Sequence, residues 1–193
     1  MKRHQLVFIL AASLVAARAH AQSIGIFFDP QGASCSATIP SGGTGTMFIM
    51  SVLGGGVAGG TTGAEFRVDG FPSAWFANIV PSPASNLQIG SPLSGVGCNI
   101  AFPMCQTGSV VLLYTVSFFA STQVVNQYVR CLARNPPLNP SFPCPLMTRC
   151  GFPFDIVCGT GGEGILNPTG SGCTVAAEPA TWSRVKRLYG TPR

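Results

Sequence analysis

The chain has 193 residues, of which 11 are Lys or Arg and 6 are Asp or Glu, so only 9% of the sequence is charged. An ordinary soluble domain carries about 25% charged residues. Together with 24 glycines and 16 prolines, this composition excludes a coiled coil, a charged helical bundle and a charge-rich disordered chain.

Residues 1–21 are predicted to be a secretory signal peptide. A basic start at residues 2–4 precedes an apolar run at 6–17, and Ala19 and Ala21 supply the small residues of a cleavage site. Twelve apolar residues are too few for a membrane-spanning helix, which needs about 20. We therefore expect a product that is extracellular, periplasmic or held in the outer cell envelope, with no transmembrane segment after cleavage.

Cleavage would also remove both histidines, His4 and His20. The remaining chain would then have no Ser-His-Asp or Cys-His catalytic site, no His-ligated haem and no His-containing zinc site. Eight basic and six acidic residues would remain, a net charge of +2, and four of the eight basic residues lie in the last ten positions. No nucleic-acid partner is expected from this distribution.

Residues 22–177 are expected to form one antiparallel β-sandwich of the immunoglobulin-like class. Sixteen prolines act against long helices, and turn signals separate short runs of β-branched and aromatic residues. The predicted strands are 23–29, 35–39, 46–53, 64–70, 75–80, 87–89, 100–102, 110–120 and 124–132. The Gly-rich residues 54–63 are interpreted as a flexible loop.

Two of these strands carry the most specific patterns. In 64–70, Glu65, Arg67 and Asp69 alternate with apolar residues, so they are expected on one solvated face with weak ion pairs. The run 110–120 is apolar at almost every position and is expected to be a central strand buried on both sides.

Eight cysteines remain after export, and their number and spacing favour up to four structural disulfides. They are Cys35, Cys98, Cys105, Cys131, Cys144, Cys150, Cys158 and Cys173. The closest two have five residues between them, so no C-x-x-C pair favours a metal or redox site, and neither a metal nor a cofactor is expected. The pairing stays open among 105 arrangements, with a local Cys98–Cys105 loop suggested. Disulfides are expected to replace a hydrophobic core as the source of order in the Cys-rich third, about 133–177.

No catalytic residues are predicted, and the protein is expected not to be an enzyme. Glu65 and Asp69 are the only closely spaced carboxylates, but four residues along a strand separate them by roughly 13 Å. A glycosidase needs two carboxyl groups about 5–10 Å apart. The Gly-rich stretch 159–164 lacks the Lys-Ser/Thr of a phosphate loop.

Trp75 and Phe76 form the most aromatic stretch outside 110–120. Exposed, they would stack on sugar rings or anchor a protein partner; buried, they would belong to the sandwich core. Both interpretations stay open at this point.

Residues 178–193 are expected to form a basic amphipathic tail with a short helix that begins after Thr181. The apolar residues of this segment recur at helical spacing: Trp182, Val185, Leu188 and Tyr189. Basic residues such as Lys186 occupy the other positions around the helix. A helix of this length is unstable in isolation. We therefore expect it to dock on its own domain, on a partner or on an envelope surface, and to act as a sorting signal.

Two sets of residues carry a resemblance to known proteins. With G-A-E-F-R-V at 63–68 and V-V-L-L-Y-T-V-S-F at 110–118, the order of strands resembles cohesin-type and other immunoglobulin-like sandwiches of secreted bacterial proteins. The ending T-W-S-R-V-K-R-L-Y at 181–189 is similar to a W-x-x-V-K-x-L-Y ending of uncharacterised secreted bacterial proteins. The resemblance implies a fold and no known activity, and dockerin binding is not carried over because cohesins lack so many cysteines.

These features together predict a secreted structural or adhesive protein of the cell envelope or extracellular matrix. It would act through protein–protein contacts, including self-association, because low surface charge favours association. The alternative is a carbohydrate-binding module that uses Trp75 and Phe76.

Overall fold

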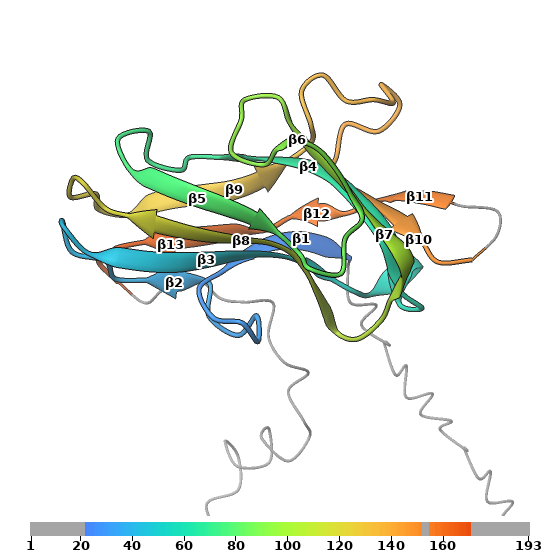
Figure 1. Ribbon diagram of the computed structural model, residues 1–193, viewed down its shortest axis with the longest axis horizontal. Coiled ribbons are helices and arrows are strands. Elements are labelled where there is room, and N and C mark those ends of the chain that lie inside the picture. Colours follow the sequence, from blue (N-terminus) through green and yellow to red (C-terminus); the bar gives the residue numbers. More distant parts are fainter. Residues whose placement is uncertain (1–21, 152–154, 171–193) are drawn as a thin grey trace, which may run out of the picture.

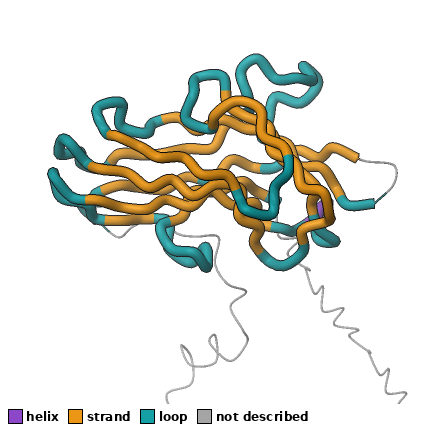
Figure 2. The backbone as a smooth tube through the Cα atoms, viewed as in Figure 1, coloured by secondary structure: helices purple, strands orange, loops and turns teal. Residues whose placement is uncertain are grey.

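The computed structural model describes residues 22–151 and 155–170. Strands and the loops that join them make up almost all of this chain (Figure 2), and the single helix within it is the three-residue 3-10 turn η1 (Gly55–Val57). The prediction of an all-β protein is confirmed for this part of the chain. The signal peptide and the tail with its short helix lie outside the described residues.

The strands form two sheets in a sandwich-like arrangement (Figure 1). The five-stranded sheet has the order β12 (Thr160–Gly161), β1 (Ser23–Phe27), β3 (Thr44–Val52), β8 (Val110–Phe119), β5 (Phe76–Pro81). The path through the eight-stranded sheet is β11 (Asp155–Cys158), β10 (Leu146–Arg149), β4 (Thr61–Asp69), β9 (Gln127–Leu132), β13 (Glu163–Leu166), β2 (Ser36–Ala37). Off this path, β7 (Gly97–Gln106) pairs with β4, and β6 (Leu87–Ser91) pairs with β7.

Both sheets are mixed, so the prediction of a purely antiparallel sandwich is wrong. β12 runs parallel to β1, and β2 runs parallel to β13. Each parallel pair joins segments more than a hundred residues apart in the sequence. Such pairing needs a long connection and leaves no local sequence signal.

The core lies between the sheets and contains apolar side chains from both. Phe66 of β4 meets Tyr114 of β8 edge to face, with ring centroids 6.0 Å apart. Ile24, Ile26 and Met47 are fully buried in the same cluster. Alternation along each strand places these residues inward and their neighbours outward.

A β-bulge in β8 changes which residues of this strand face the core. The register with β3 shifts there, and the consecutive residues Leu113 and Tyr114 are both fully buried. The extra residue reverses the alternation, so Ser117 and Phe119 point outward and are exposed. β8 is central in its sheet, as predicted, but the expectation of burial on both sides is wrong. The bulge explains why the sequence lacks a simple alternation.

The polar face of β4 is partly covered, contrary to the prediction of a solvated face. Glu65 is buried and accepts a hydrogen bond from the backbone N–H of Leu138 at 3.2 Å. Arg67 donates from Nε to the carbonyl of Ala133 at 3.0 Å and forms an ion pair with Asp69. The chain between β9 and β10 therefore crosses this face, a long-range contact that the alternation of β4 does not reveal.

Two segments predicted to be irregular are ordered. Within the predicted loop 54–63, Val57 of η1 is fully buried and β4 begins at Thr61. Residues 146–166 of the Cys-rich third contain four strands, β10 to β13, with β10 and β11 paired antiparallel. Leu146, Met147 and Leu166 of these strands are buried, so this third contributes to the core and the expectation that disulfides replace a core here is wrong.

The disulfides of this region do not include the suggested Cys98–Cys105 pair. Cys105 is bonded to Cys150, with Cα atoms 5.7 Å apart. Cys98 and Cys105 both lie in β7, and seven residues along a strand separate two Cα atoms by roughly 20 Å, which is far too long for a disulfide. A second bond joins Cys144 to Cys158 across the β10–β11 hairpin, with Cα atoms 5.6 Å apart.

Cys35 is disulfide-bonded as well, whereas Cys98 and Cys131 are buried free thiols, so the eight cysteines do not reach the upper limit of four disulfides. Cys98 lies opposite Phe66 of β4, and Cys131 lies opposite Val68. The backbone N–H of Val68 donates a hydrogen bond to the turn between β6 and β7, which therefore lies along one edge of β4. Strand β9, which pairs with β4 at Val68, lies along the opposite edge. The thiols are thus on strands that flank β4, with Cα atoms about 10 Å apart, beyond the 7 Å limit of a disulfide. Cys173 lies outside the described residues.

Candidate functional site

Trp75 and Phe76 point in opposite directions although they are adjacent in the chain. Trp75 is 6% exposed, its indole N–H donates to the carbonyl of Thr122 at 2.9 Å, and its ring stacks on Phe118 at 5.3 Å. Phe71 contacts the same ring edge-on at 6.0 Å. Trp75 is therefore a core residue, and its interpretation as an exposed binding residue is wrong.

Phe76 is 71% exposed at the start of β5 and has a second aromatic residue beside it. Phe119 of β8, 40% exposed, lies directly opposite Phe76, and the two ring centroids are 6.5 Å apart at an angle of 35°. Thr44 of β3 continues this cross-strand row beyond Phe119. The row therefore presents two outward-facing rings on the surface of the sheet.

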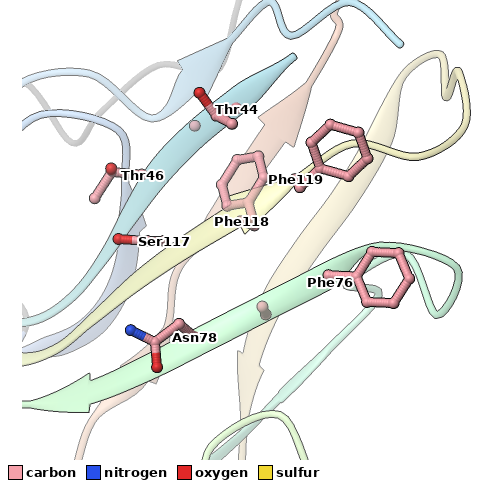
Figure 3. A pocket seen from close by; sticks show the side chains of 9 residues that line it. Thr44, Thr46, Phe76, Asn78, Ser117, Phe118 and Phe119 are labelled. Atoms are coloured by element: carbon pink, nitrogen blue, oxygen red, sulfur yellow. The ribbon is translucent and has the colours of Figure 1, made fainter. Parts of the chain in front are cut away.

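A polar row lies next to the aromatic row. Asn78 of β5, Ser117 of β8 and Thr46 of β3 are cross-strand partners, two residues along from Phe76, Phe119 and Thr44. Figure 3 shows these three polar side chains gathered on one side of the two exposed rings. The two rows line a shallow groove of about 630 Å³.

We call this surface the groove face, defined by Phe76, Phe119, Thr44, Asn78, Ser117 and Thr46. Sequence reasoning identified only Phe76. Residues 76–81 are apolar at every position except Asn78, so the sequence does not mark which side of β5 is exposed. The β8 side was hidden by the bulge, which obscures which of Phe118 and Phe119 is exposed.

Charge is absent from the groove face and from its whole sheet. None of the strands β12, β1, β3, β8 and β5 contains Asp, Glu, Lys or Arg. The chain has no charged residue from 70 to 129, which the sequence alone reveals. Three ion pairs instead involve the eight-stranded sheet: Arg67–Asp69, Arg130–Glu163 and Arg149–Asp155. The two sheets therefore differ sharply in the surface that they present to solvent.

Both sheets have an open edge strand without charge. β5 ends the five-stranded sheet, and β6 pairs only with β7 among the described strands. Val80 of β5 and Leu87 and Ile89 of β6 are each about half exposed. Only five residues, 82–86, join the two strands, so the end of β5 and the start of β6 lie at most about 20 Å apart.

The carboxylates and thiols offer little for catalysis in the described part of the chain. Glu65 is buried beneath the chain around Leu138, and Asp69 is paired with Arg67. Burial raises the pKa of Cys98 to about 12 and also raises that of Cys131. Both thiols are therefore neutral and shielded, the opposite of a reactive nucleophile. Within residues 22–151 and 155–170, no three His, Cys, Asp or Glu side chains are grouped so that they could bind a metal ion.

The predicted tail residues Trp182, Val185, Lys186, Leu188 and Tyr189 lie outside the described residues. Within the described residues, no helix has the length and apolar character needed to cross a bilayer.

The fold and the groove face define a disulfide-bonded, two-sheet β protein with an uncharged sheet. No model of a known protein family matches this chain, and a comparison with curated proteins finds no match either.

Proposed function

We propose that this is an exported, non-enzymatic structural or adhesive protein of the cell envelope or extracellular matrix. It acts through protein–protein contacts and self-associates by strand addition at β5 and β6. The proposal includes export through cleavage of residues 1–21, and a sandwich that is a variant of the immunoglobulin-like or cohesin-like type. Disulfides such as Cys105–Cys150 fit an oxidising compartment.

The observation that carries the proposal is the pair of uncharged edge strands, β5 and β6, each with one edge that no described strand covers. Soluble β proteins usually protect such edges with charged side chains, proline in the strand, bulges or a covering loop. β5 and β6 contain no charged residue, and the one proline, Pro81, ends β5. Val80, Leu87 and Ile89 add exposed apolar side chains to the unpaired backbone groups. A second chain can therefore extend either sheet through backbone hydrogen bonds.

The test measures the oligomeric state of the oxidised chain 22–193 by light scattering after size-exclusion chromatography and by negative-stain microscopy. We expect concentration-dependent assemblies larger than a monomer. Val80→Lys and Ile89→Lys place a charge on each edge strand and should shift the protein to monomers. Val125→Lys is the matched control, because Val125 is 59% exposed but lies in the β8–β9 loop. A wild-type chain that stays monomeric at high concentration, or edge variants that assemble like the wild type, would contradict the proposal.

A further inference from the structure

We propose that the groove face binds a neutral polysaccharide. Phe76 and Phe119 would stack on the sugar rings, and Asn78, Ser117 and Thr46 would form hydrogen bonds with the sugar hydroxyls. This inference goes beyond strand-mediated assembly, because it uses the outer face of the five-stranded sheet and not its edge.

The first argument is the exposure of the two aromatic rings. Leaving a phenyl ring in water forgoes about 1.5–3 kcal/mol of burial. Phe76 and Phe119 contact each other at 6.5 Å, yet they remain 71% and 40% exposed. The hydrophobic C–H face of a pyranose covers such a ring, and rings this close can contact neighbouring sugars of one chain.

The second argument is the unused hydrogen-bonding capacity beside the rings. The side chains of Asn78, Ser117 and Thr46 make no hydrogen bond to any other described residue. An amide and two hydroxyls provide donors and acceptors together, which is what sugar hydroxyls require. The cross-strand register holds this row parallel to the aromatic row, so one sugar chain can contact both.

The third argument is charge, which selects the class of glycan. Not one residue in the five strands of this sheet carries a charge, and the loop at 70–75 and the turn at 40–43 next to the groove have none either. A uronate or sulfate group would have no cation to pair with, so its desolvation would be uncompensated. A neutral glycan pays no such cost. The groove face therefore matches neutral polysaccharides and disfavours anionic ones.

The experiment measures binding of the oxidised chain 22–193 to insoluble cellulose and chitin by pull-down. It also measures binding to cellohexaose, chitohexaose and mannohexaose by calorimetry, with polygalacturonate as the anionic comparison. We expect binding to at least one neutral glycan and none to polygalacturonate. Phe76→Ala and Phe119→Ala should each weaken binding roughly tenfold, and Phe76→Trp should retain it. Met104→Ala is the matched control, because Met104 is 72% exposed on β7 of the other sheet, and its binding should be unchanged.

Three outcomes would overturn the proposal: no binding to any neutral glycan in the panel, binding that survives Phe76→Ala and Phe119→Ala, or a preference for polygalacturonate. The Ile89→Lys variant separates this proposal from assembly, because it alters the β6 edge and leaves the groove face intact. If Ile89→Lys is monomeric and still binds the glycan, the two properties are independent. If its affinity for a soluble hexasaccharide, measured by calorimetry, falls with assembly, the site is not confined to one chain, and the proposal as stated is wrong.

Discussion

Replacing Trp75 by alanine removes a buried side chain that packs against Phe118, a residue that lines the groove. A Trp side chain buries on the order of 200 Å², which at about 25 cal/mol per Å² is worth about 5 kcal/mol at most. Trp75 also donates to the carbonyl of Thr122 and stacks on Phe118, so little can replace it. We therefore expect Trp75→Ala to lower the free energy of unfolding by about 4 kcal/mol.

Two further variants separate the causes of this loss. Trp75→Phe keeps an aromatic ring but leaves the Thr122 carbonyl without its donor, so it should cost about 1–2 kcal/mol plus a packing term. Phe76→Ala should change the free energy of unfolding by less than about 0.5 kcal/mol, because that ring is 71% exposed.

The assay is urea unfolding of the oxidised protein followed by far-UV circular dichroism. A shift in the midpoint at constant m-value reports stability alone. The reasoning would be refuted if Trp75→Ala cost less than about 1 kcal/mol, or if Phe76→Ala cost as much as Trp75→Ala. Either result would mean that Trp75 is not the buried ring or that Phe76 is not the exposed one.

Four further predictions concern the two free thiols, a disulfide and a buried amide. Because the pKa of Cys98 is raised to about 12, its contribution to stability is complete below about pH 8.5 and declines as the pH rises toward 12; Cys98→Ala should flatten this slope in urea titrations. Thiol labelling of the unreduced protein should modify Cys98 and Cys131 only after denaturant is added, and labelling of the native protein at pH 8 would contradict their burial. The double variant Cys105→Ser/Cys150→Ser should lose about 4 kcal/mol, since this bond closes a loop of 45 residues, and an unchanged urea midpoint would contradict that estimate. Asn167→Asp should cost about 2–3 kcal/mol, because the amide of Asn167 donates at 2.9 Å to two backbone carbonyls that a carboxylate repels; a loss below about 0.5 kcal/mol would contradict this.

The alternation of polar and apolar residues predicted a strand wherever the strand has one face in the core and no bulge interrupts it. β4 is the clearest case, since Phe66 and Val68 are buried as the period of two requires. The same alternation predicted that Glu65 is exposed to solvent, which is wrong. Its burial depends on a segment some seventy residues further along the chain, which covers the outer face of β4.

The groove face shows the same division between local and long-range information. The charge-free run 70–129 was readable in the sequence. The position of Phe119 beside Phe76 was not, because it depends on the pairing of β5 with β8 and on the bulge at Leu113.

Composition and local alternation were enough to predict the all-β class of the described residues and the lack of charge in the strands of one sheet, because both act over a few residues. The tertiary structure alone decided which cysteines pair, which of two adjacent aromatic residues is buried, and which edge strands stay open. Cys105 and Cys150 are 45 residues apart in the chain, yet their Cα atoms are 5.7 Å apart, whereas Cys98 and Cys131 are held apart by β4. Such outcomes depend on the register between distant strands, which packing of the core sets and no local pattern encodes.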